Sequence, residues 1–237
     1  MATLRVSAVV RSSLVSNHVI EDHSETWHCG DLTDAIILGL QQRIDLDRES
    51  QVVRGIDALD EVSLHPLLED SLRKAGYGVF REQRYPHART RKSKSEGRRC
   101  DLVLTHHKRP LQDPAASATL FEDPQAVPLQ KAFWLEVKTV SQFTESGPNA
   151  SWTSELLGTV RHDISKLAND QEIAHAGLLI LLWVEDARIA THDFAVWQDR
   201  CLAKNLPIGA PSERQVSIQD RLGHHAGVLR LYPVHHM

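Results

Sequence analysis

Three residues on two predicted strands carry side chains suited to metal-assisted hydrolysis. Asp101 begins the apolar run DLVL, Glu136 lies inside the apolar run WLEVK, and Lys138 follows two positions later. A buried ionised carboxylate is costly, so each acid must be paired, protonated or bound to a cation. Two converging carboxylates repel each other, and a hard divalent cation relieves that repulsion. The pattern therefore predicts a magnesium site, whose bound waters can act as nucleophiles.

The spacing of Glu136 and Lys138 places both side chains on one face of a strand, because side chains alternate with period two. The ammonium of Lys138 is then expected beside the metal, where it can position or help to deprotonate water and offset charge on a phosphorane-like transition state. Val137 is expected to point into the apolar layer and to offer its backbone carbonyl as a further metal ligand. An ExK pair alone is also typical of a solvated edge strand. The apolar neighbours favour an interior strand: Phe133, Trp134, Leu135 and Val140.

The elements that must position these residues follow from the hydrophobic pattern between Glu61 and Val184. Leucines at helical spacing predict a helix that Gly76 ends, and the run at 176–184 is apolar throughout, as in a strand buried on both faces. The predicted order is that helix, strands at 79–85, 101–105 and 132–140, a helix after Thr153 or Ser154, and the strand at 176–184.

The sequence resembles the PD-(D/E)XK nuclease superfamily. It has an αβββαβ order, an aspartate on one strand, a long connection, and Glu-x-Lys on the next strand. The resemblance covers about half the chain and implies an α/β, restriction-endonuclease-like core with a mixed central sheet flanked by helices. In that superfamily the residues matching Asp101 and Glu136 ligate Mg²⁺, for which Mn²⁺ can substitute. The lysine matching Lys138 assists the water, and phosphodiester hydrolysis leaves a 5′-phosphate. The chain departs from the literal motif, because Arg99 and Cys100 precede Asp101 in place of proline.

Glutamates near the first predicted core helix are candidates for a further catalytic residue that many superfamily members carry. Glu61 is preferred, because it precedes His65 and Pro66 in an arrangement similar to the E-x-x-L-H-P starts of some members. Proline is comfortable only in a first helical turn, so Glu61 is expected just before the helix or across a kink, and a capping or solvated acid is the alternative. Glu69 is expected to be a solvated acid. Glu82 is either a site residue or part of the polar side of its strand, and His65 is either beside the site or a polar residue of the helix start.

A basic segment between residues 81 and 99 directly precedes Asp101, although the net charge of the chain is −4. Such residues neutralise backbone phosphates without reading base sequence, and a solvated loop is the alternative. On the later helix, Arg161 and Lys166 are expected to reach phosphates near the site, with an Asp163–Lys166 ion pair as an equal alternative. The predicted nucleic-acid contacts of the basic segment are Arg89, Arg91, Lys92, Lys94, Arg98 and Arg99.

The pattern divides the chain into a core at 51–190 and two additions. The N-terminal addition, 1–50, is expected to hold a strand at 4–8 and a helix after Asp31. Prolines in 108–131 exclude a continuous helix or central strand, so this part is predicted to be an insertion in the core. The C-terminal addition, 191–237, is expected to form a helix near 193–205 and one or two short strands, such as 227–232, packed on the core.

Composition excludes several classes of protein. The 41% hydrophobic content is enough for a buried interior, and no apolar run is long enough to span a bilayer, so a cytoplasmic protein without a membrane partner is expected. The three cysteines have no CxxC spacing, which argues against a disulfide framework or a thiolate zinc site. A zinc site from His18, His23, His28 and Cys29 is the weaker hypothesis, because five-residue steps miss the helical i, i+4 geometry.

These observations lead to three hypotheses. The first is a magnesium-dependent nuclease that acts on DNA rather than RNA on the superfamily resemblance, which also implies a homodimer for double-strand cleavage. The second is a catalytically inactive protein of the same fold that binds nucleic acid or serves as a scaffold; the intact Asp, Glu and Lys set favours the enzyme. The third is a zinc-binding regulator.

Overall fold

A six-stranded mixed sheet forms the centre of the protein. The computed structural model describes residues 26–86, 99–112, 123–219 and 222–236. Neighbouring strands are antiparallel except β3 and β6, which are parallel. The sheet order is β1 (Gly78–Arg84), β2 (Arg99–Thr105), β3 (Phe133–Ser141), β6 (His175–Val184), β8 (Ala226–Val234) and β7 (Ser212–Ser217). The predicted α/β class with a mixed central sheet is confirmed.

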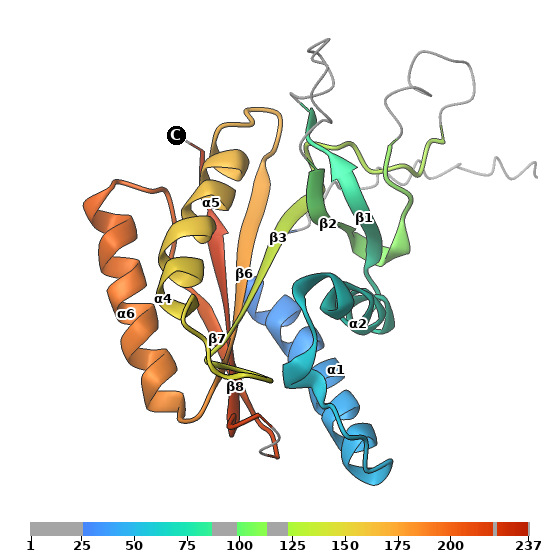
Figure 1. The fold of residues 1–237 in the computed structure, drawn as a ribbon. Helices are drawn as coiled ribbons and strands as arrows, with labels where there is room; N and C mark the ends of the chain where they lie inside the picture. The colour runs from blue at the N-terminus through green and yellow to red at the C-terminus, as the bar shows by residue number, and fades with distance from the viewer. Residues whose placement is uncertain (1–25, 87–98, 113–122, 220–221, 237) are drawn as a thin grey trace, which may run out of the picture.

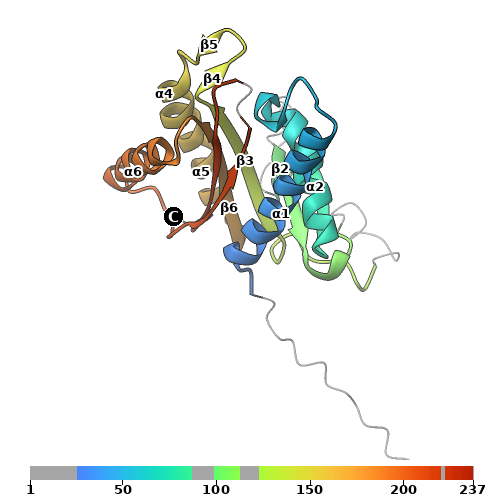
Figure 2. The same cartoon turned by 90° about the horizontal axis from the view of Figure 1, so that it is seen from below.

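Helices cover both faces of this sheet (Figures 1 and 2). One face carries α1 (Cys29–Glu49) and α2 (Glu61–Lys74), and the other carries α5 (Val160–Ala168) and α6 (Ala187–Ala203). Alternate residues of β6 enter the two apolar layers. For example, Leu178 packs in the layer of α5 and α6, and Leu179 packs in the layer of α1 and α2. The run from Ala176 to Val184 is apolar throughout and both of its faces are buried, as predicted.

The elements from Glu61 to Val184 occur in the predicted order, with small additions. A short hairpin of β4 (Phe143–Thr144) and β5 (Gly147–Pro148) follows β3. The next helical stretch begins with α4 (Trp152–Ser154) and a π-helical turn, η4 (Glu155–Thr159), before α5. Two 3-10 turns complete the described set, η1 (Ile56–Ala58) and η2 (His106–Lys108).

The start of α2 differs from the expectation for Glu61. The Asp60 carboxylate caps the helix by accepting a hydrogen bond from the Ser63 amide at 2.8 Å, so Glu61 is the first helical residue. Pro66 lies inside the helix and not in its first turn, the position where proline is most comfortable. Its missing amide leaves the Val62 carbonyl without a helical donor, and Val62 is 66% exposed, so water can reach that turn.

The C-terminal addition is more integrated than predicted. Helix α6 begins at Ala187, earlier than expected, because the Asp186 carboxylate accepts a hydrogen bond from the Arg188 amide. The strand predicted at 227–232 is the longer β8, which pairs with both β6 and β7. These strands therefore extend the central sheet itself.

The N-terminal addition is described only in part. The strand predicted at 4–8 lies outside the described residues. Helix α1 packs against α2 where Gly39 meets Ser71 so closely that a Cβ at Gly39 would lie 1.7 Å from the Ser71 hydroxyl oxygen. In the described part of the insertion, Leu111 and Val127 form a single parallel bridge. No helix in the described ranges combines the length and the apolar character that a membrane span requires.

Candidate metal centre

The predicted acidic pair lies where β2 and β3 separate. The last backbone pair between these strands joins Leu102 to Leu135, so Asp101 and Glu136 are the next residues on each strand. One Asp101 carboxylate oxygen, Oδ2, accepts a hydrogen bond from the Val137 amide at 2.8 Å. Asp101 therefore bridges the two strands at the point where their backbone pairing stops. This point, with the side chains of Asp101, Glu136 and Lys138, is called the fork below.

Glu136 is the most buried acid of this fork, at 3% exposure. The Tyr85 hydroxyl donates a 2.5 Å hydrogen bond to Glu136 Oε1, and the Lys166 ammonium lies 3.7 Å from the same oxygen. Burial and then the charge of Asp101 raise the pKa of Glu136 to about 8, and Lys166 and Tyr85 offset part of that rise. The two carboxylates are thus close enough to repel each other, as the sequence pattern predicted.

Lys138 connects the fork to both flanking helices. Its ammonium lies 3.0 Å from Glu61 on α2 and 3.7 Å from Asp163 on α5. Burial by itself lowers the pKa of Lys138, but the hydrogen bond and charge of Glu61 and the charge of Asp163 outweigh it, so the pKa is raised. Lys138 is therefore a cation at neutral pH.

Two residues of α5 belong to the same charge network. Lys166 lies 2.6 Å from Asp163, which is the ion pair considered from the sequence. Both residues are largely buried and face the fork, because Asp163 contacts Lys138 and Lys166 contacts Glu136. The sequence did carry a signal for Asp163: it lies three residues after Val160 and four before Leu167, on the apolar side of the helix.

His65 completes a second grouping at the fork. The residue is 2% exposed, and neither ring nitrogen has a hydrogen-bond partner among the residues that the structure describes. One side-chain ligand atom from each of Glu61, His65 and Asp101 lies within 4.8 Å of the others. Within the described ranges this is the one group of at least three acids, histidines or cysteines close enough to hold a metal. His18 and His23 of the zinc hypothesis lie outside those ranges.

The structure separates Glu61 from the other two glutamates considered. Glu69 pairs with Arg73 one turn along α2, at 2.8 Å. Glu82 is exposed on β1, and its carbonyl accepts a hydrogen bond from Arg99. Only Glu61 of the three contacts Lys138.

Of the remaining predicted site residues, some are buried near the fork and others are exposed or bonded elsewhere. The Val137 side chain is fully buried in the apolar layer of α1 and α2, as predicted. Arg99 is exposed at the start of β2, and Arg161 donates a hydrogen bond to the Leu157 carbonyl. Lys166 is only 18% exposed and points into the fork. The other predicted nucleic-acid contacts lie outside the described residues: Arg89, Arg91, Lys92, Lys94 and Arg98.

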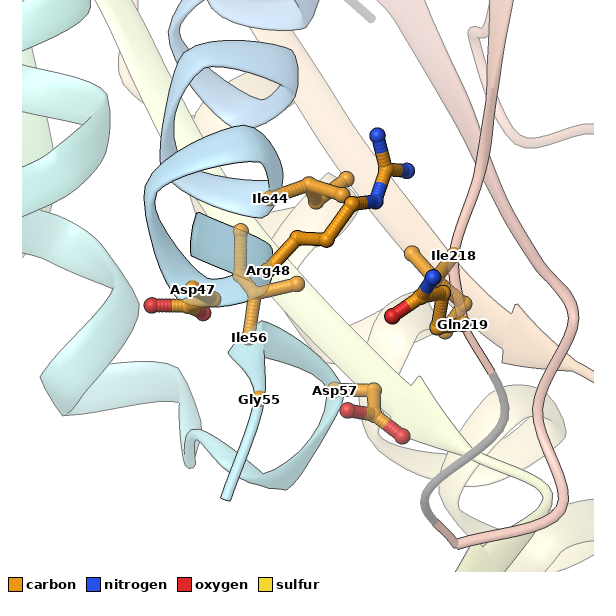
Figure 3. Close-up of a pocket in the computed structure, with 8 residues that line it drawn as sticks. All are labelled: Ile44, Asp47, Arg48, Gly55, Ile56, Asp57, Ile218 and Gln219. Carbon is orange, nitrogen blue, oxygen red and sulfur yellow. The ribbon is translucent and has the colours of Figure 1, made fainter. Parts of the chain in front are cut away.

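A cavity away from the fork is too small to bind a substrate. It lies between the end of α1, the turn at 55–57 and the segment after β7, and its volume is about 20 Å³ (Figure 3). That space suits about one water molecule. A larger, open pocket of about 670 Å³ lies beside the start of α6, where Glu185, His192 and His225 line it, but none of the predicted site residues is among its lining residues.

Comparison of the chain with protein-family models, with curated proteins and with solved structures gave no match. The geometry of the fork is therefore the feature from which a function can be inferred.

Proposed function

We propose that this protein is a divalent-metal-dependent nuclease with a restriction-endonuclease-like core, which hydrolyses phosphodiester bonds in nucleic acid. The observation that carries the proposal is the convergence of Asp101, Glu136 and Lys138 where β2 and β3 separate. The buried Glu136, with a second carboxylate beside it, is costly if stability is its only role. Such an arrangement is typical of a site in which a cation and a phosphate are bound together.

The donor set at the fork fits a divalent cation. Asp101 and Glu136 offer the carboxylate oxygens that Mg²⁺ or Mn²⁺ prefers, and the Val137 carbonyl is a further predicted ligand. A bound cation would supply Lewis-acid polarisation of the phosphoryl oxygens and a more acidic water.

The charge of Lys138 indicates which catalytic role it can take. Because the acids around it raise its pKa, Lys138 is protonated at neutral pH and is a poor general base. It is suited instead to donate a hydrogen bond to the attacking water or to a phosphate oxygen, and to offset the negative charge that grows there. Glu61 and Asp163 hold its ammonium at the fork.

DNA is the proposed substrate, in keeping with the superfamily that the sequence resembles. Arg99 is exposed two residues before Asp101, and the basic stretch that precedes it supplies further cations for a phosphate backbone. Contacts of this kind give affinity that falls with salt and does not depend on base sequence. A homodimer is proposed for the cleavage of both strands of a DNA duplex.

One observation favours a second candidate, a noncatalytic nucleic-acid-binding or scaffold protein. The acids Glu61, Asp163 and Glu136 already pair with Lys138 or Lys166. A network neutralised in this way could hold α2 and α5 to the sheet without turnover. This candidate predicts DNA binding with a steep salt dependence and no binding of Mg²⁺ or Mn²⁺ by calorimetry.

Cleavage assays with matched variants test the nuclease proposal. The purified protein is incubated with supercoiled plasmid, linear duplex, single-stranded DNA and RNA, with Mg²⁺, with Mn²⁺ or with chelator. Asp101→Asn and Lys138→Ala should each lower the rate by about 10²-fold or more. The control is Glu69→Gln, which removes an acid of α2 that pairs with Arg73 and should keep the wild-type rate. Wild-type rates in both Asp101→Asn and Lys138→Ala would overturn the proposal.

A further inference from the structure

His65 is an unusual residue for the interior of this protein. It is 2% exposed on α2, and its two ring nitrogens have no hydrogen-bond partner within the described ranges. A buried polar group without a partner costs about 1–3 kcal/mol, so such a group requires an explanation. Packing alone is a weak explanation, because a leucine would fill a similar space without that cost.

The position of His65 relative to two acids supplies an explanation. Glu61 lies one helical turn before His65, so the two side chains share a face of α2. That face meets β2 at Asp101, and the ligand atoms of the three residues lie within 4.8 Å of one another. Three atoms bonded to one ion at about 2.0–2.2 Å lie about 3–3.8 Å from one another, so side-chain movements of up to about 1 Å complete the set.

We infer that Glu61, His65 and Asp101 bind a transition-metal dication, and that His65 makes this site prefer such ions to Mg²⁺. Imidazole is a good ligand for Co²⁺, Ni²⁺ and Zn²⁺, whereas Mg²⁺ takes oxygen ligands. The inference rests on the proposed function in one respect, because it names the metal class of that same site. It changes the expected ligand set, since Glu136 lies outside the group.

The neighbouring lysine can accommodate such an ion. The Lys138 ammonium lies 3.0 Å from Glu61, so a cation on Glu61 repels it. Asp163 offers the nearest alternative, at 3.7 Å from that ammonium, and the Oδ2 atom of Asp163 has no hydrogen-bond partner among the described residues. A small shift of Lys138 from Glu61 towards Asp163 therefore keeps both groups neutralised.

Metal binding can be measured without any cleavage reaction. Chelator-treated, dialysed full-length protein is titrated with CoCl₂ and with MgCl₂ by calorimetry, and the visible spectrum of bound Co²⁺ is recorded. The wild type should bind Co²⁺ at least about tenfold tighter than Mg²⁺. His65→Leu should lose at least about tenfold in Co²⁺ affinity and alter the Co²⁺ spectrum, while its Mg²⁺ affinity changes little. The control Glu69→Gln should match the wild type.

Folding of the variant is checked in the same preparation. Because His65 has no hydrogen bond to lose among the residues that the structure describes, His65→Leu in chelator should be at least as stable as the wild type by thermal unfolding. Unchanged Co²⁺ affinity in His65→Leu, or equal affinity of the wild type for Co²⁺ and Mg²⁺, would overturn the inference.

The two proposals fail in different ways. Co²⁺ binding through His65 without cleavage of any nucleic acid refutes the nuclease and leaves the metal site standing. Cleavage with Mg²⁺ that is indifferent to His65→Leu, together with unchanged Co²⁺ affinity, refutes the metal site and leaves the nuclease standing.

Discussion

Replacement of Glu136 by glutamine should change how the stability of this protein depends on pH. In the folded protein the pKa of Glu136 is raised to about 8, first by burial and then by the charge of Asp101, against an ordinary value of 4.5. Between those two values the folded chain keeps a proton on Glu136 that the unfolded chain has released. Because the folded state then binds more protons, its free energy of unfolding falls as pH rises.

The size of the effect follows from the two pKa values. Within that window the free energy of unfolding falls by about 1.4 kcal/mol for each pH unit. The fall is smaller near the two pKa values, where Glu136 is only partly titrated. Between pH 5 and pH 8, Glu136 should therefore cost the wild type about 3–4 kcal/mol of stability. Glutamine does not titrate, and its amide oxygen can still accept the hydrogen bond that Tyr85 donates.

Urea unfolding at several pH values, in chelator, measures the difference. The stability of Glu136→Gln minus that of the wild type should rise by about 3–4 kcal/mol from pH 5 to pH 8. A second variant, Tyr85→Phe, tests whether the pKa of Glu136 controls this pH dependence. Loss of the Tyr85 hydroxyl removes a contact that lowers the pKa of Glu136, so the wild-type decline should become steeper. Parallel stability curves for the wild type and Glu136→Gln would refute the reasoning.

Three further predictions concern the scaffold, each measured by urea unfolding. Gly39→Ala should cost about 1–3 kcal/mol, since its Cβ would overlap Ser71, and adding Ser71→Gly should recover part of the loss. His224→Ala should lower the free energy of unfolding by about 3 kcal/mol or more, because it removes the hydrogen bonds of His224 to the buried Asp57 carboxylate and to the Phe143 amide. A loss below about 1 kcal/mol would contradict this. Arg188→Ala should change stability by less than about 0.5 kcal/mol, because its side chain is 91% exposed despite a 2.6 Å ion pair.

Much of the fold was predictable from local patterns. The strand period placed Glu136 and Lys138 on one face, and both side chains contact groups at the same fork. The run from Ala176 to Val184 is buried on both faces, as its continuous apolar character indicated. These predictions needed only the order of residues along a single element.

What could not be predicted depends on contacts between distant segments. Tyr85 reaches Glu136 across 51 positions of sequence, and nothing near Tyr85 marks it as a partner of an acid. The burial of His65 depends on how α2 meets the sheet, and the exposure of Val62 explains how Pro66 is tolerated. Lys166 looked like a surface cation because its ion pair with Asp163 is local, whereas its approach to Glu136 is a tertiary contact.

The short contact between β2 and β3 has a mechanical consequence. Those strands pair only from Leu102 to Leu104, whereas β3 and β6 pair along the whole of β3. This seam therefore has fewer backbone pairs than any other pair of neighbouring strands in the sheet, while the apolar layer under α1 and α2 continues across it. The Glu61–Lys138 ion pair joins α2 to β3 beside this seam, so it adds a side-chain link where the backbone pairing of β2 and β3 has stopped.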